Sequence, residues 1–174
     1  ERRLDDRAIL PFNWLSSGLS SGLRDEPYRI ESKYTDKRLY ILMTKRERIY
    51  NKFGGLCAYS GTPLESDWQI DHVKPVVRNW FSNDMVFKKD DCEDNMVPVQ
   101  KIINHYKHSL SLYEFRNWLL GNLHERLKKL PKNPKTEKSK RHKDYMMRVA
   151  GYFGITESKP FNGVFYFETI LKSE

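Results

Sequence analysis

Two short strand-like runs, followed almost directly by a helical segment, constrain the fold of this 174-residue chain more than any other pattern. Residues 68–73 (WQIDHV) alternate in polarity and favour a strand, and residues 96–100 (MVPVQ) form a second short run. The proline in the second run indicates a strand at the edge of a sheet. A polar stretch at residues 74–94 separates the runs, and a helix is expected from Lys101 to His108. The pattern predicts a small α+β core.

Polar side chains in these three segments suggest a metal site. Asp71 and His72 are neighbours on the first predicted strand, so their side chains point to opposite faces. Asn104 and His108 are four residues apart on the predicted helix and share one face. If this helix packs across the strands, Asp71, Asn104 and His108 converge on one cation. Carboxylate, amide and imidazole ligands together suit a divalent ion that stays partly hydrated, such as Mg²⁺ or Mn²⁺.

The composition narrows the class of partner and the compartment. The chain has 31 Lys and Arg residues against 23 Asp and Glu residues, which gives a net charge of +8 and a pI of about 9.4. This balance favours a polyanionic partner such as DNA, because each phosphate contact releases condensed counterions. We expect a cytoplasmic protein that does not contact a membrane, because no apolar run approaches about 20 residues and no signal-peptide pattern opens the sequence. The two cysteines, Cys57 and Cys92, are expected to be buried free thiols, with one disulfide as the alternative.

Four segments resemble, in order, the motifs of the HNH endonuclease family. Residues 70–75 (IDHVKP) look like the first motif, and residues 94–99 (DNMVPV) resemble the central Asn motif. Residues 103–107 (INHYK) resemble the terminal Asn-x-x-Lys motif of the Asp-His-Asn subgroup, and residues 57–61 (CAYSG) are similar to the turn before the first motif. The intervals of nine residues from Asn95 to Asn104 and four from Asn104 to His108 also fit. In detail, residues 45–110 look most like the HNH domains of Cas9-type nucleases.

The resemblance implies the ββα-metal fold and a role for each matching residue. His72 would be the general base that takes a proton from the attacking water. Asp71 and Asn104 would hold a divalent metal, most simply Mg²⁺, with His108 as a possible third ligand or phosphate contact. Asn95 would tie the loop between the strands by hydrogen bonds to the backbone.

The resemblance also implies contacts with the substrate and two departures from the family. Lys107 would contact phosphate, with Lys74 and Lys101 as further substrate-binding residues. The turn at residues 57–61 has Ser60 where many members have the second zinc-binding cysteine, so no structural zinc is expected. The interval from His72 to Asn95 is 23 residues, longer than in compact members, so we expect an insertion around residues 80–92.

The chain outside the motifs divides into an arm, flanking helices and an extension. Residues 1–35 are expected to form an N-terminal arm or loop, and residues 36–130 the nuclease core with flanking helices. One of these helices is predicted over residues 36–53, and another opens at a capping box at residues 111–114. Residues 131–143 are predicted to be an exposed basic linker that could also lie along DNA. Residues 144–174 are predicted to be a helix and a C-terminal strand, at residues 164–168, packed on the core.

These features predict a metal-dependent DNA endonuclease from a prokaryote or phage, acting in restriction, phage defence or a mobile element. Two alternatives stay open. One is a nuclease subunit that cuts only with a protein partner, such as an ATPase or a guide complex. The other is a DNA-binding module whose HNH core is not catalytic. The sequence leaves both a monomer and a homodimer possible.

Overall fold

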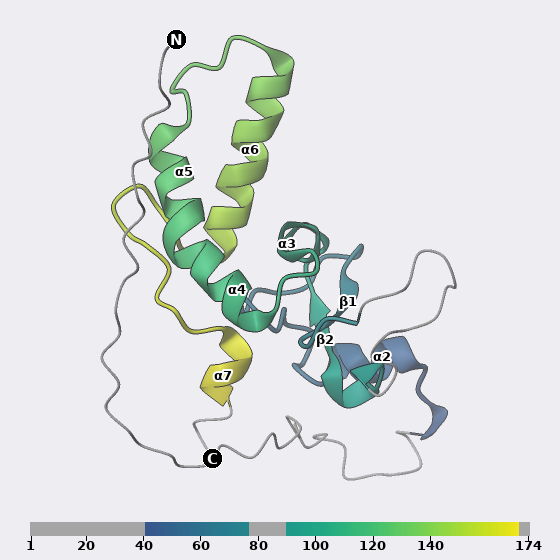
Figure 1. Cartoon of the computed structure of the whole chain (residues 1–174). Helices are drawn as coiled ribbons and strands as arrows, with labels where there is room; N and C mark the ends of the chain where they lie inside the picture. The colour runs from purple at the N-terminus through teal and green to yellow at the C-terminus, as the bar shows by residue number, and fades with distance from the viewer. Residues whose placement is uncertain (1–40, 77–89, 171–174) are drawn as a thin grey trace, which may run out of the picture.

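The computed structural model describes residues 41–76 and 90–170, which combine helices with a small sheet (Figure 1). The predicted α+β class is therefore confirmed. The predicted arm at residues 1–35 and most of the expected insertion at residues 80–92 lie outside the described residues. The elements, in chain order, are α2 (Lys45–Asn51), β1 (Gln69–His72), η2 (Glu93–Asn95), β2 (Met96–Val99), α3 (Lys101–Lys107), α4 (Leu112–Asn117), η3 (Trp118–Leu123), α5 (His124–Lys129), α6 (Glu137–Tyr152) and α7 (Tyr166–Ile170).

The sheet consists of β1 and β2, which pair antiparallel with Asp71 opposite Val97. All four residues of β2 are buried, and α3 begins at Lys101, two residues after β2 ends. Ala58 donates a backbone hydrogen bond of 2.9 Å to the carbonyl of Pro98, so the turn before β1 lies against β2. The two strands and the helix predicted from the sequence are confirmed, each with bounds within one residue of those expected.

Helix α2 is shorter than the predicted helix over residues 36–53. Thr44 has an extended backbone and forms a capping box with Glu47, so α2 begins at Lys45 and the predicted helix is interrupted there. Helix α2 is fastened to the segment before β2, because Arg48 pairs with Glu93 and Lys52 Nζ donates to the carbonyl of Met96 at 3.1 Å.

Helices α4 and α5 continue into one another through η3, which is a π-helical segment. The capping box predicted here is present between Ser111 and Glu114. The buried stripe recurs every four residues and consists of Phe115, Leu119, Leu123 and Leu127. This interval exceeds the 3.6 residues of an α-helical turn, so a regular helix would rotate the stripe by about 40° at each step. The wider π turn reduces this drift and keeps the stripe toward the core.

Helix α6 begins inside the linker predicted at residues 131–143, so the prediction is wrong for residues 137–143, whereas residues 131–136 lack regular structure. The helix begins at Glu137, where Thr136 accepts a hydrogen bond of 3.2 Å from the backbone of Ser139. Its residues Met146, Val149 and Ala150 are buried in the core, and this packing stabilises the helix. Helices α5 and α6 run side by side, and their connected ends project away from the sheet (Figure 1).

The C-terminal strand predicted at residues 164–168 is also wrong, because the chain forms helix α7 from Tyr166. Phe165 and Phe167 are buried, with their rings stacked at a centroid distance of 6.1 Å. The backbone amides of Tyr166 and Phe167 donate to the carbonyls of Tyr59 and Ala58, at 3.1 and 2.9 Å. The aromatic alternation therefore reflects packing against the turn at residues 57–60, not pairing in a sheet.

Both cysteines lie in the part of the chain that the structure describes, as do the helices that were compared with a membrane span. Cys57 and Cys92 are both free thiols; Cys57 is buried as expected, whereas Cys92 is exposed. Within residues 41–76 and 90–170, no helix has the length and apolar character needed to cross a bilayer.

Candidate active site

Asp71 lies at the centre of the site and is 9% exposed. Its Oδ2 accepts hydrogen bonds from the hydroxyl of Tyr59 at 2.8 Å and from the ammonium group of Lys107 at 3.0 Å. Burial, together with the neighbouring Asp71 carboxylate, raises the pKa of Tyr59 well above its usual value, so the phenol stays protonated and donates. In the described part of the chain, Oδ1 of Asp71 has no hydrogen-bond partner. One oxygen of Asp71 is therefore fixed and the other is available.

Lys107 does not have the substrate-binding position that we expected. Its side chain is 1% exposed, and Nζ also donates to the carbonyl of His72 at 3.1 Å. A buried carboxylate is costly without a counter-charge, and the ammonium group of Lys107 supplies it. The prediction that Lys107 contacts phosphate is therefore wrong. Lys107 is an internal partner of Asp71 that links α3 to β1.

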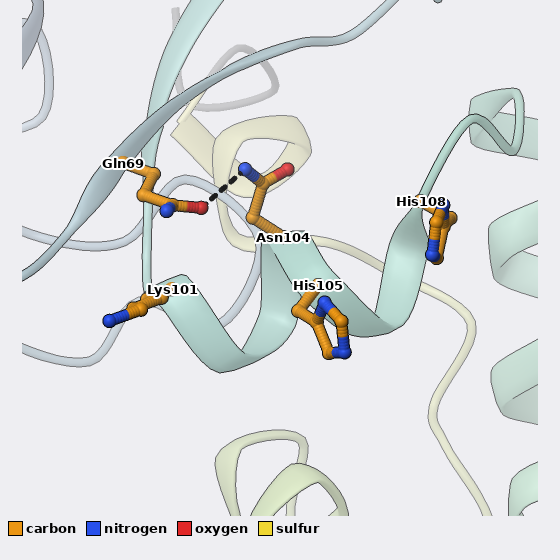
Figure 2. Close-up of a pocket in the computed structure, with 5 residues that line it drawn as sticks. All are labelled: Gln69, Lys101, Asn104, His105 and His108. Atoms are coloured by element: carbon orange, nitrogen blue, oxygen red, sulfur yellow. Dashed lines mark hydrogen bonds between the residues drawn. The ribbon is translucent and has the colours of Figure 1, made fainter.

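Asn104 reaches the same face of β1 as Asp71. Its Nδ2 donates to Oε1 of Gln69 at 2.8 Å, the contact drawn in Figure 2. Gln69 and Asp71 are two residues apart on β1 and share a face, while Asn104 and Lys107 are nearly one turn apart on α3. The pairs Asn104–Gln69 and Lys107–Asp71 thus align the helix along the strand. Asp71 and Asn104 both contact partners between β1 and α3, and their convergence on one cation stays a prediction.

His108 lies just past the end of α3 and not within the helix as we expected, although it lines the same pocket as Asn104. Helix α3 ends at Lys107, and His108 has left-handed backbone geometry with φ of 56°. The backbone amide of His108 still donates to the carbonyl of Asn104 at 3.0 Å, but its dihedral angles leave the helical range, so its side chain does not continue the helical direction. In Figure 2 the amide of Asn104 turns toward Gln69, and the imidazole of His108 lies at the far end of the helix.

His72 projects to the other side of β1, where its Nε2 lies 3.0 Å from Oδ1 of Asp91. An ionised carboxylate only accepts hydrogen bonds, so a neutral imidazole in this contact carries its proton on Nε2 and leaves Nδ1 as an acceptor. The two side chains are 27% and 29% exposed, so water reaches them. The sequence did not single out Asp91, which lies 19 residues from His72.

Asn95 holds the segment that carries Asp91. Its Oδ1 accepts from the backbone amide of Lys74 at 2.8 Å, and its Nδ2 donates to the carbonyls of Lys74 and Asp90 at 2.9 and 2.8 Å. The carbonyl of Asn95 accepts from the amide of Val73 at 3.0 Å. These bonds are of the kind expected for Asn95, and they fasten residues 90–95 beside the end of β1. Asp91 reaches His72 because of this connection.

A pocket with a volume of about 330 Å³ opens beside Asn104 (Figure 2). Its lining residues are Gln69, Lys101, Asn104, His105 and His108. Lys101 lies at the edge of the pocket, and its Nζ is 3.3 Å from Oδ2 of Asp67. Its side chain is exposed, so a substrate can reach it. The other expected substrate contact, Lys74, has an exposed side chain. His105 has no role in the predicted motifs, and its ring lies 5.8 Å from that of His108.

The available donors suit a hard divalent cation. Within the described residues, no group of three or more His, Cys, Asp or Glu side chains is placed to bind a metal. The donors that β1 and α3 offer are instead Oδ1 of Asp71 and Oδ1 of Asn104, whose Nδ2 is already committed to Gln69. Mg²⁺ typically takes one or two protein oxygens and completes its shell with water and substrate phosphate. The donor chemistry therefore fits Mg²⁺ or Mn²⁺.

Comparison of this chain with protein-family models, with curated proteins and with solved structures found no match. A functional interpretation therefore depends on the motifs and on the geometry of Asp71, His72, Asn95 and Asn104.

Proposed function

We propose that this protein is an HNH-type endonuclease with a ββα-metal core that hydrolyses DNA phosphodiester bonds with a divalent metal ion. The proposal rests on Asp71 and His72, two neighbouring residues of β1 whose side chains have different contacts. Asp71 faces α3 and keeps Oδ1 free, while His72 faces Asp91 with Nδ1 as its acceptor. A general base and a metal-binding carboxylate are the two groups that this reaction needs.

His72 is the proton acceptor of the proposed reaction. Its Nδ1 takes a proton from the attacking water as the new bond from the water oxygen to phosphorus forms. The bond from phosphorus to the 3′ oxygen then breaks, and the products carry a 5′-phosphate and a 3′-hydroxyl after solvent protonates the leaving oxygen. Asp91 holds the ring in one orientation and stabilises the positive charge that the imidazole gains.

Asp71 and Asn104 would hold the metal ion through their free oxygens. When bound, a divalent cation stabilises negative charge on the scissile phosphate and on the departing 3′ oxygen. The hydroxyl of Tyr59 and the ammonium group of Lys107 both act on Oδ2, so Asp71 cannot rotate without losing two hydrogen bonds. This arrangement keeps the remaining oxygen pointed in one direction before the metal arrives. Lys101 and Lys74, whose side chains are both exposed, would contact the substrate backbone.

The test is nicking of a supercoiled plasmid by the purified chain in Mg²⁺ and in EDTA. We expect metal-dependent cutting, with a loss of 100-fold or more in His72→Ala, on the order of the contribution of a general base. The matched control is His124→Ala, because His124 contacts the carbonyl of Glu157 and lies outside the site.

Four outcomes would contradict the proposal. Cutting that survives in His72→Ala would remove the assigned base, and cutting that persists in EDTA would remove the metal. DNA binding without cutting would favour a binding module instead. Cutting that appears only when a second protein is added would favour the partner-dependent subunit.

A further inference from the structure

The net charge of the chain is concentrated in one short segment. Residues 126–143 contain nine of the 31 Lys and Arg residues but one of the 23 Asp and Glu residues, Glu137. The rest of the chain therefore has 22 basic and 22 acidic residues and is neutral on balance. The +8 charge that suggested a polyanionic partner thus belongs to this segment and not to the protein as a whole.

This segment, which we call the basic hairpin, is the projecting end of α5 and α6 together with the loop between them (Figure 1). Its turn is braced by Lys143, whose Nζ donates to the carbonyls of Lys132 and Pro131 at 2.8 and 3.2 Å. The charges are therefore displayed on a folded scaffold, at a position removed from the sheet.

Three lysines of the basic hairpin are exposed and have no acidic partner among the described residues: Lys132, Lys135 and Lys138. Two other lysines are neutralised locally, since Lys128 pairs with Glu125 at 2.9 Å and Lys140 with Glu137 at 2.7 Å. Clustered cations of one sign repel each other and destabilise a compact state. An external polyanion would relieve this repulsion.

The surface of the basic hairpin indicates which polyanion it fits. None of the large apolar side chains exposed in the described part of the chain falls within residues 126–143. A helix that lies on a membrane needs an apolar face to insert beside its basic face, and the hairpin lacks one. Exposed lysines on a polar scaffold are instead suited to phosphate groups at the surface of a nucleic acid.

The basic hairpin also leads away from the candidate active site. Tyr145 of α6 contacts His105 of α3, with ring centroids 6.1 Å apart, and His105 lines the pocket beside Asn104. From Tyr145 back to Glu137 the helix rises about 12 Å, on the order of three or four base pairs of duplex. A duplex that crosses the pocket and continues along α6 would meet the exposed lysines.

We infer that the basic hairpin is a second nucleic-acid surface, which binds the duplex backbone a few base pairs from the cleaved bond. The choice of DNA, and of the cleaved bond as reference, rests on the proposed nuclease function. Backbone binding by the hairpin does not depend on catalysis.

The test compares two triple variants with the same loss of charge. Lys132→Gln/Lys135→Gln/Lys138→Gln alters the hairpin, and Lys45→Gln/Arg148→Gln/Lys159→Gln removes three exposed charges elsewhere. Binding of a duplex of about 25 base pairs is measured in EDTA by fluorescence anisotropy, between about 50 and 200 mM salt. Thermal melting of both variants establishes that each is folded.

We expect the slope of log affinity against log salt concentration to be shallower than that of the wild type by about three units in the hairpin variant. In the control variant the slope should change by less than about one unit. Over this salt range the wild type would then lose about 40-fold more affinity than the hairpin variant. Equal slopes for the wild type and the hairpin variant would overturn the inference. So would hairpin-dependent binding to anionic phospholipid vesicles without binding to the duplex.

The binding and cutting experiments can reject either proposal without rejecting the other. If the hairpin variant binds like the wild type while the wild type cuts plasmid with Mg²⁺, the hairpin inference is wrong and the nuclease stands. If the hairpin variant loses salt-dependent binding while no chain cuts, the nuclease proposal is wrong and the hairpin surface stands.

Discussion

The ammonium group of Lys107 lies 3.0 Å from Oδ2 of Asp71, inside the protein, where the lysine is 1% exposed. A cation supplied by the chain itself thus neutralises one side of the carboxylate that we propose as a metal ligand. The hydroxyl of Tyr59 binds the same oxygen. Asp71 is therefore both a structural ion-pair partner and, through Oδ1, a candidate ligand.

Replacing Lys107 should destabilise the fold. Lys107→Met leaves the carboxylate of Asp71 buried without its counter-charge, and we expect the free energy of unfolding to fall by about 3 kcal/mol or more. Chemical denaturation measures this change. In the background of Asp71→Asn the same substitution should cost much less, because no buried anion remains.

The control for Lys107 is Lys101→Met, which removes a lysine from the same helix. Lys101 pairs with Asp67 at the surface, with side chains 58% and 55% exposed, so we expect a change below about 1 kcal/mol. Equal stability changes for Lys107→Met and Lys101→Met would show that the buried pair is not important for folding.

Asp91 should control which nitrogen of His72 carries the proton. A side-chain amide can donate as well as accept, so in Asp91→Asn the contact no longer requires a proton on Nε2 of His72. The fraction of His72 in which Nδ1 is unprotonated therefore falls. We expect plasmid cutting to fall about tenfold to 100-fold, less than in His72→Ala, with the ¹⁵N signals of the His72 ring shifting toward a mixture of tautomers. The control Asp90→Asn removes the same charge one residue away. Unchanged ring signals in Asp91→Asn would refute this role.

Asn95 and Asp91 should act as one unit. Asn95→Ala removes hydrogen bonds to Lys74 and Asp90, so the segment that carries Asp91 is released from β1. Once that segment is released, the further change Asp91→Ala has little left to remove. The losses of cutting rate in Asn95→Ala and Asp91→Ala should therefore not add in the double variant. Fully additive losses would mean that Asn95 does not act through Asp91.

Glu93 should give the fold a pH-dependent contribution. The hydrogen bond from Arg48 lowers the pKa of Glu93 below its usual value of 4.5, against an opposing effect of burial. A lowered folded-state pKa stabilises the fold above the unfolded value, and this contribution disappears as the pH falls through the folded value. The gap in stability between the wild type and Glu93→Gln should be about 1 kcal/mol or less near neutral pH and close at acid pH. Denaturation at several pH values checks this, and a gap that is independent of pH would contradict it.

The local elements of the core could be predicted, whereas those decided by distant contacts could not. The strands and α3 lie in short runs with clear boundaries, and their predicted bounds are nearly correct. Residues 131–143 suggested a linker because Lys and Pro dominate them, although Thr136 and the apolar Met146, Val149 and Ala150 favour a helix. The alternating aromatics at residues 164–168 have the period of a strand, but the turn at residues 57–60 occupies their backbone amides.

The candidate site likewise has features that could be predicted from the sequence and features that could not. The shared face of Asp71 and Asn104 follows from the periods of a strand and a helix, so the sequence was sufficient to predict it. The burial of Lys107 depends on Tyr59 and Asp71 meeting it in the folded protein, and no local pattern reports this. Gln69 could have been found, because it lies two residues from Asp71 on the same face. Asp91 could not, because the contact spans 19 residues across the polar stretch.

The backbone amides of Tyr166 and Phe167 hold the turn that carries Tyr59. This has a consequence for the order in which the protein is made. On the ribosome the Asp-His pair and α3 emerge before the segment that braces Tyr59, because residues 166–167 lie far downstream in the sequence. The hydroxyl that fixes Asp71 lacks this support until residues 166–167 have been synthesised. For the proposed nuclease, the growing polypeptide would carry an unfinished catalytic centre until then.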